Sequence, residues 1–301
     1  MSAQTRPRLA ITLGDPRGIG PEIVASALGD DRVREACEPV VVGPEGAGLA
    51  VDRSVGAWEP SGGAAMAGRL AGSAIEDAAS LALAGDVEGI VTAPIDKAAL
   101  LAGGYDYPGH TEMLARIADV PVAMMLASDR LRVVLVTTHI ALRDVVERLT
   151  GDAIIETAEI TRRGLRDWYA VAEPRIALCA LNPHAGDGGR FGSEDEEILA
   201  PAARKAGVEG PFPADTVFVR AMRGAFDAVL APYHDVGMTA IKVASFGSAV
   251  NVTLGLPFPR TSPDHGTALD IAGKGVADPS SFIHATLECA RIARRIAERA
   301  T

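Results

Sequence analysis

Cysteine and aromatic residues are scarce in this sequence, and their scarcity narrows the kind of protein it can encode. The three cysteines of the 301 residues lie far apart and form neither a paired framework nor a CxxC metal motif. We therefore expect a reducing, cytoplasmic setting. Aromatic residues make up 4% of the chain, so the core must be built mainly from Ala, Val, Leu and Ile.

Long apolar runs and an excess of positive charge are also missing. No uncharged apolar run reaches the roughly 18 residues that would suggest a membrane helix, and the N-terminal segment lacks the apolar core of a signal peptide. The formal net charge is −10, which argues against binding to nucleic acid or to an anionic membrane surface. A small anionic substrate remains compatible with this charge, because a few basic side chains can dominate one cleft.

The dinucleotide fingerprint GxGxxG does not occur, although short β-branched runs alternate with Ala-rich helical stretches throughout the chain. This alternation predicts βαβ units, a mostly parallel sheet and an α/β fold. The expected strands are 9–13, 39–42, 89–93, 122–127, 132–137, 175–181, 228–231 and 249–254. The expected helices are 21–28, 72–84, 111–118, 141–148, 152–169, 194–206 and 281–299. The Gly-, Ala- and Ser-rich stretch 45–69 gives no clear pattern and is expected at the surface.

Three of the six histidines, His139, His184 and His234, each follow a predicted strand. Strand ends at one edge of a sheet can converge, so these three could form a metal site that leaves positions open for substrate. The alternative is that each is a loop histidine bonded to a backbone carbonyl. The spacing alone does not decide between the two.

A second group of residues suits an anion. Lys242 and Arg260 lie among apolar residues with Asn251 between them, and such cations can hold a phosphate or a carboxylate. His110 and Thr111 stand at a predicted helix start, whose free N–H groups also favour an anion, although Thr111 could simply cap the helix. The two cations could instead be ordinary surface charges. Asp215 could be a base, a partner of another site residue or a turn residue.

Several long motifs, in order, resemble the PdxA family of the isocitrate and isopropylmalate dehydrogenase superfamily. They include GDPRGIGPE (14–22), YPGHTEMLA (107–115), VTTHIALRDV (136–145), LNPHAGDGGRFGSEDEEI (181–198) and VNVTLGLPFPRTSPDHGTALDIAGKGVADP (250–279). The resemblance runs from about residue 9 to residue 282. It implies two α/β/α subdomains of the isopropylmalate dehydrogenase type with a cleft between them, and not a Rossmann fold. Residues 1–108 with 255–301 would form the nucleotide-side subdomain, and residues 109–254 the metal, substrate and dimerisation subdomain.

The resemblance also implies roles for individual residues, which are grouped here by ligand. The metal ligands are His139, His184 and His234; the substrate-binding residues are His110, Thr111, Lys242, Asn251 and Arg260; the cofactor-binding residues are Gly14, Gly18, His265, Asp270 and Asp278. The implied enzyme is a homodimer with a shared active site, holding NAD or NADP and one divalent metal, zinc, magnesium or cobalt. It would oxidise the 3-hydroxyl of 4-phosphohydroxy-L-threonine, with decarboxylation of the keto acid, in vitamin B6 biosynthesis. Lys242 or Asp215 would be the base, and the absence of an obvious Arg beside the adenosine loop favours NAD.

Two positions depart from the family pattern. Val236 replaces the glutamine of YHDQG, and Arg17 stands where a small residue is common. Both bear on the substrate, so other acids stay open: phosphorylated threonate or erythronate, or a dihydrodiol dicarboxylate. A metal-dependent hydrolase and a non-catalytic binding protein are two alternatives from other classes. NAD binding would argue against the first, and turnover would argue against the second.

Overall fold

The computed structural model describes residues 6–245 and 247–300, and the chain divides into two compact units. Met1–Val120 and Leu256–Thr301 form the first unit, and Pro121–Gly255 form the second. The second unit thus begins later than the expected residue 109, because helix α5 (His110–Ala118) packs against α3 (Gly63–Ala84) of the first unit. The roles expected of the two subdomains stay predictions.

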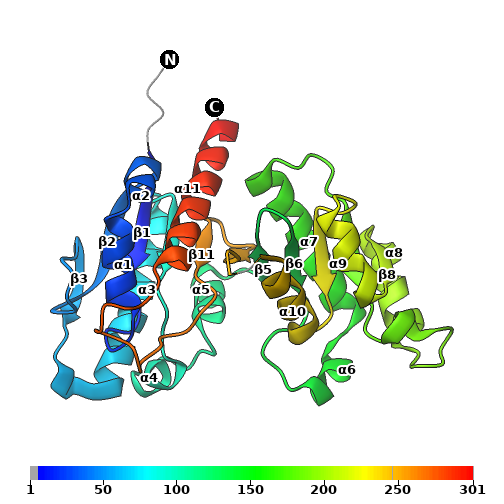
Figure 1. The fold of residues 1–301 in the computed structure, drawn as a ribbon, viewed down its shortest axis with the longest axis horizontal. Coiled ribbons are helices and arrows are strands. Elements are labelled where there is room, and N and C mark those ends of the chain that lie inside the picture. Colours follow the sequence, from blue (N-terminus) through cyan, green and yellow to red (C-terminus); the bar gives the residue numbers. More distant parts are fainter. Residues whose placement is uncertain (1–5, 246, 301) are drawn as a thin grey trace. The chain divides into compact units, whose positions relative to one another are not determined.

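The first unit is built on a fully parallel sheet in the order β3-β2-β1-β4-β11. Its strands are β1 (Arg8–Thr12), β2 (Glu38–Glu45), β3 (Arg53–Ala57), β4 (Gly89–Thr92) and β11 (Arg260–Ser262). Its helices are α1 (Gly20–Leu28), α2 (Asp31–Ala36), α3, α4 (Lys97–Ala102), α5 and α11 (Ser280–Ala300), with a short 3₁₀ turn η1 (Pro60–Gly62). β1 and β4 are buried almost throughout, as expected of strands covered on both faces. Helix α3 packs on β1 and β2, whereas α11 packs on β4 and β11 beside α1 and α2 (Figure 1).

The second unit has a mixed sheet in the order β10-β5-β6-β9-β7-β8. Its strands are β5 (Ala123–Ala127), β6 (Arg132–Leu135), β7 (Ile176–Cys179), β8 (Glu209–Phe212), β9 (Ala228–Ala231) and β10 (Val250–Leu254). Its helices are α6 (Val145–Arg148), α7 (Gly151–Tyr169), α8 (Ala200–Ala206), α9 (Ala214–Met222) and α10 (His234–Ser245), with the turns η2 (Leu142–Asp144) and η3 (Pro183–Gly186) and the π-helical turn η4 (Asp195–Leu199). β5 runs antiparallel to β10 and β6, and the other pairs are parallel.

The core of the second unit follows the two-residue period of its strands. Alternate residues such as Val133 and Leu135 of β6, and Val229 and Ala231 of β9, lie in one cluster with residues of α9 and α10. Helix α7 instead packs on β5, β6, β9 and β10, and α8 packs against α7. The prediction of an α/β fold with a mostly parallel sheet is therefore confirmed.

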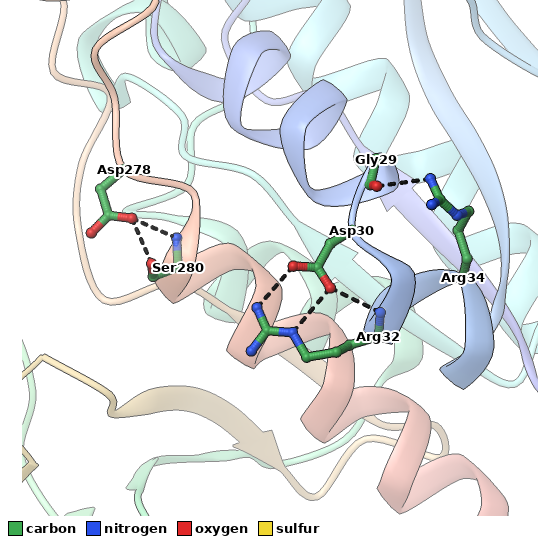
Figure 2. Close-up of polar contacts among 6 residues, drawn as sticks. All are labelled: Gly29, Asp30, Arg32, Arg34, Asp278 and Ser280. Carbon is green, nitrogen blue, oxygen red and sulfur yellow. Dashed lines mark hydrogen bonds and ion pairs between the residues drawn. The ribbon is translucent and has the colours of Figure 1, made fainter.

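The short helix α2 shows how local sequence sets an element boundary. Asp30 precedes the helix in an extended conformation, and its carboxylate accepts a hydrogen bond from the Arg32 backbone N–H at 2.9 Å. The Arg32 guanidinium adds two bonds to the same carboxylate (Figure 2). Such an N-cap satisfies a helix N–H that has no partner within the helix.

The region 45–69 contains more structure than its sequence indicated. It holds the exposed edge strand β3 and the first turns of α3, which begins at Gly63 and not at residue 72. In residues 6–245 and 247–300, no helix combines the length and the apolar character that crossing a bilayer requires.

Candidate functional site

The three strands that precede the candidate metal ligands lie side by side in the second unit. β6, β9 and β7 are neighbours and run parallel, so their carboxyl ends share one edge of the sheet. His139 follows β6, His184 follows β7, and His234 opens α10 directly after β9. The topology therefore brings the loops of all three histidines to one edge, as ligand sites in open α/β sheets require.

Two of these histidines are close together. The ring centroids of His139 and His234 are 5.6 Å apart, and both rings line a cavity of about 130 Å³. The two loops are tied together by Thr137, whose buried hydroxyl donates to the Pro232 carbonyl at 2.7 Å. His234 Nδ1 lies 2.7 Å from Asp235 Oδ1. A carboxylate on one ring nitrogen is the usual companion of a metal-binding histidine, because it orients the ring and leaves Nε2 for the ion.

His184 lies in the turn η3, which follows β7. Its ring lies 6.5 Å from that of Phe191, and its backbone has φ 54° inside the turn η3. In the described part of the chain, no three His, Cys, Asp or Glu side chains form a group that could hold a metal ion. Imidazole is a suitable donor for a divalent cation, and the roles of His139, His184 and His234 as metal ligands stay predictions.

A buried carboxylate shapes the backbone that carries His184. Asp195 is 1% exposed, and its two oxygens accept hydrogen bonds from the backbone N–H groups of Leu181 at 2.9 Å and Asn182 at 3.0 Å. These amides follow β7, where the chain leaves the sheet. Asp195 falls in the expected helix 194–206, and the sequence alone does not distinguish it from its acidic neighbours in GSEDEEI.

The other candidate residues of the second unit are more scattered. Asp215 is exposed in the first turn of α9 and lines a mainly apolar pocket of about 600 Å³ between α9 and α10, which Val236 also lines. Lys242 is exposed in the last turn of α10. Asn251 lies on β10 opposite Leu126, and its buried Oδ1 has no hydrogen-bond partner. Leaving a buried acceptor without a donor costs free energy, so a ligand that donates a hydrogen bond to Asn251 Oδ1 would fit this position.

The first unit holds a buried cation, the guanidinium of Arg260. This side chain is 2% exposed and donates from Nη2 to Thr92 Oγ1 at 2.6 Å. Burial lowers its pKa to about 10, against the opposing effect of the Glu112 charge, so the guanidinium is still protonated at neutral pH. Burying a charge is expensive unless the charge is paired, and a buried group with a strongly shifted pKa is a candidate for a functional site.

His110 lies near enough to Arg260 to feel its charge. It is the first residue of α5, and its Nε2 is buried with no hydrogen-bond partner. Its pKa lies well below 6.5, because burial disfavours the imidazolium and because Arg260 and Lys97 add positive charge nearby. Thr111 follows it in the first helical turn and is half-buried. The structure therefore places His110, Thr111 and Arg260 in one unit, and it adds Lys97, which sequence reasoning had not selected.

The glycine-rich segment between β11 and α11 carries the expected nucleotide residues. His265, Asp270 and Asp278 are exposed in it. Asp278 Oδ1 accepts hydrogen bonds from Ser280 N at 2.9 Å and from Ser280 Oγ at 2.6 Å (Figure 2). These bonds, aided by the charges of His265 and His284, lower the pKa of Asp278. Asp278 therefore fixes the start of α11, and its contact with a nucleotide stays a prediction.

Gly14 and Gly18 allow backbone segments to approach closely. A Cβ at Gly14, which has φ 68°, would lie 2.2 Å from the Pro94 carbonyl oxygen, and one at Gly18 would lie 2.8 Å from the Thr267 oxygen. The added charge of Arg17 is neutralised by Asp15, to which the guanidinium donates two hydrogen bonds at 2.7 and 3.0 Å. The loop thus packs against protein backbone, and no nucleotide contact is needed to explain either glycine.

The fold first defines a class of protein. The chain is similar to the solved structure of a β-decarboxylating dehydrogenase from Thermococcus kodakarensis, with a TM-score of 0.53 at 16% identity over 92% of this chain and 80% of that chain. At this identity the likeness shows the fold alone, which is the isopropylmalate dehydrogenase type expected from the sequence.

Closer relatives give the family. Residues 32–289 match the family described as pyridoxal phosphate biosynthetic protein PdxA, and the chain belongs to this family. It is 44% identical to 4-hydroxythreonine-4-phosphate dehydrogenase of Geobacter metallireducens, covering 96% of both chains. It is 43% identical to D-threonate 4-phosphate dehydrogenase of Cupriavidus necator, covering 96% of this chain and 98% of that protein. The crystal structure of the Klebsiella pneumoniae 4-hydroxythreonine-4-phosphate dehydrogenase matches with a TM-score of 0.84 at 37% identity, covering 95% and 99% of the chains. The protein is accordingly an oxidoreductase of the dehydrogenase class.

Proposed function

We propose that the protein oxidises the 3-hydroxyl of 4-phosphohydroxy-L-threonine with NAD or NADP, with decarboxylation of the resulting keto acid, as a step of pyridoxine biosynthesis. The observation that carries the proposal is the buried Arg260 beside His110. The Arg260 guanidinium is 2% exposed, and its planar set of donors suits a phosphate or a carboxylate of the substrate. The relatives named for this reaction support the choice of substrate.

Each residue of the anion site has a task in this proposal. Arg260 supplies a planar fork for two oxygens of the anion, and Thr92 holds that fork in place. His110 is neutral at physiological pH because its pKa is lowered, so its buried Nε2 can donate or accept a hydrogen bond without adding charge. The assignment of Lys242 and Asn251 to substrate binding rests on the family resemblance.

His139, His234 and His184 are assigned to one divalent cation, which could be zinc, cobalt or magnesium. A cation bound there would supply Lewis-acid polarisation of substrate oxygens, and a bound nicotinamide would supply the hydride acceptor. Asp235 keeps the His234 ring oriented through Nδ1. Lys242 or Asp215 takes the proton of the 3-hydroxyl, so that proton and hydride leave the same carbinol.

We also propose that the protein works as a homodimer with a shared active site. This rests on the family resemblance. Light scattering on the purified protein tests it directly: a mass of one chain, 31.2 kDa, at the concentrations used for kinetics would contradict it.

The test of the proposed function is NADH formation with 4-phosphohydroxy-L-threonine, measured with and without EDTA. We expect activity that EDTA abolishes and that returns when the metal is restored. His184→Ala should lose both activity and bound metal, measured as metal content per chain. His265→Ala, which alters an exposed histidine outside the proposed metal site, should keep its metal.

A second candidate substrate is a 4-phosphorylated threonate, because one relative with that name is 43% identical to this chain. The same assay with D-threonate 4-phosphate separates the two. A kcat/KM at least tenfold higher for the threonate would replace the first substrate. Turnover of a non-phosphorylated dihydrodiol alone would overturn both.

A further inference from the structure

The glycine-rich segment 263–279 contains no helix or strand, yet its conformation is specified. Gly273 and Gly275 have φ values of 73° and 67°, which favour glycine. Turns within the segment are closed by bonds from Ile271 N to the Ala268 carbonyl at 3.1 Å and from Lys274 N to the Ile271 carbonyl at 3.2 Å. These local bonds leave several backbone N–H groups to be satisfied from elsewhere.

One distant carboxylate satisfies three of them. Glu22, in the first turn of α1, accepts at Oε2 from the N–H groups of Gly273 at 3.0 Å and Gly275 at 3.4 Å, and at Oε1 from that of Ala277 at 3.3 Å. Successive N–H groups of such a turn form a concave anion site. In this protein the anion that occupies it is a side chain of the protein itself.

The other end of the segment is held by the same N-terminal loop. Ile19 N–H donates to the Thr267 carbonyl at 2.9 Å, and the absence of a side chain at Gly18 lets Thr267 approach. Residues 18–22 therefore contact the segment at both Thr267 and Gly273–Ala277. These two contacts lie on either side of Asp270.

We propose that Glu22 is a positioning residue that holds segment 263–279 in the conformation that receives the nucleotide. This rests on the proposed function, in which His265, Asp270 and Asp278 of the segment bind the nucleotide. It also assigns the N–H groups of Gly273, Gly275 and Ala277 to Glu22 and not to the phosphates of the dinucleotide.

The carboxylate is specifically required, because all three partners are donors. Gln at this position has one acceptor oxygen, and its NH₂ group would face an N–H donor. Glu22→Gln should therefore lose at least one of the bonds although its shape hardly changes. Glu22→Asp keeps two acceptor oxygens on a shorter side chain and should restore part of the effect.

The first measurement is hydrogen–deuterium exchange of the segment in the protein without nucleotide. In Glu22→Gln we expect the amides of Gly273, Gly275 and Ala277 to exchange roughly five- to tenfold faster, with Glu22→Asp in between. Glu35→Gln removes the same charge from an exposed position on α2 and should leave this exchange unchanged. Equal exchange in wild type and Glu22→Gln would overturn the proposal.

The second measurement is the effect on catalysis. A loosened segment must be ordered when the nucleotide binds, so KM for NAD should rise about tenfold in Glu22→Gln, whereas kcat and KM for the substrate should change less than about twofold. Faster exchange with an unchanged KM for NAD would overturn the nucleotide role. A wild-type protein that binds no NAD would instead overturn the proposed function, and the exchange measurement would still decide whether Glu22 holds the segment.

Discussion

At the scale of single residues, Arg260 and His110 gain their properties from burial. The guanidinium keeps its charge because its pKa, lowered to about 10, is still above neutrality, whereas the imidazole loses its charge. The same environment thus produces one cation and one neutral hydrogen-bonding group. A neutral His110 adds hydrogen-bonding capacity beside Arg260 without adding a second buried charge, whose burial would be costly.

Replacing Arg260 with Lys tests the role of the planar fork. Lys keeps a positive charge but cannot make two parallel hydrogen bonds to an anion. We expect KM for the phosphorylated substrate to rise roughly 10- to 100-fold, corresponding to about 1.5–3 kcal/mol for a bond to a charged group, while KM for NAD stays the same. The exposed Arg130→Lys is the matched control in the same steady-state assay. An unchanged substrate KM in Arg260→Lys would remove this residue from the site.

His110 makes stability depend on pH in a defined direction. Its pKa in the folded protein lies below the value of about 6.5 expected when unfolded. As the pH falls below about 6.5, the unfolded chain takes up a proton that the folded protein does not, so the free energy of unfolding falls. The loss is at most about 1.4 kcal/mol per pH unit for this group. Denaturant unfolding at several pH values should show it, His110→Gln should reduce the slope, and the exposed His265→Gln should not.

Replacing Gly14 with Ala tests the close contact between Gly14 and the Pro94 carbonyl. Alanine there has to adopt φ near 68° and place its Cβ 2.2 Å from the Pro94 oxygen. We expect Gly14→Ala to lower the free energy of unfolding by about 3 kcal/mol or more, because a rare conformation and a clash add. Gly85→Ala is the control: it has φ 77° but no atom near the added methyl, so it should cost only about 1 kcal/mol. Equal losses in the two variants would show that the contact with Pro94 does not matter.

At the scale of elements, the turn that carries His184 depends on Asp195 in η4. Asp195→Asn replaces one acceptor with an NH₂ group that faces a backbone N–H. We expect the free energy of unfolding to fall by about 1–3 kcal/mol, and the amides of Leu181 and Asn182 to exchange faster. The neighbouring exposed Glu196→Gln should change neither quantity. Normal amide protection in Asp195→Asn would show that the turn is held by other contacts.

Most buried strands could be predicted from the sequence, because runs such as 9–13 and 89–93 contain no charged residue and a single threonine each. Edge strands and short helices could not. β3 is exposed along most of its length, so no apolar pattern marks it. Helix α10 begins at His234 in a segment read as a loop, because Gly237 interrupts the helical pattern. The structure explains this glycine, since a Cβ there would lie 2.7 Å from Leu135.

The candidate site was predictable to the extent that it follows the strand order. His139 and His234 come together because each follows a strand of the same sheet edge. Glu22, by contrast, acts on residues about 250 positions later in the chain. The motif GDPRGIGPE that contains Glu22 could be recognised in the sequence. Its contact with the segment 263–279 could not, because no local sequence pattern indicates the geometry of that segment's turns.

At the scale of the whole molecule, the three cysteines report on the cores of both units. Cys37 and Cys289 lie in the first unit and Cys179 in the second, and all three are buried free thiols. Burial raises the pKa of Cys37 to about 11 and that of Cys179 to about 12, and it raises the pKa of Cys289 as well. At about pH 8 a thiol with a pKa of about 11 is ionised to only about one part in a thousand.

We therefore expect the native protein to show almost no reaction with a thiol reagent such as Ellman's reagent, and three reactive thiols after unfolding in guanidinium chloride. The reagent reacts with an ionised thiol that it can reach, and in the folded protein the three thiols are both protonated and buried. Ser80→Cys places a fourth thiol on the exposed side of α3 and should react at once in the native protein. One native cysteine reacting as fast as this control would mean that its unit opens locally at low free energy. The identity of that cysteine would identify the unit, since Cys179 belongs to the unit of His139, His184 and His234, and the other two belong to the unit of Glu22.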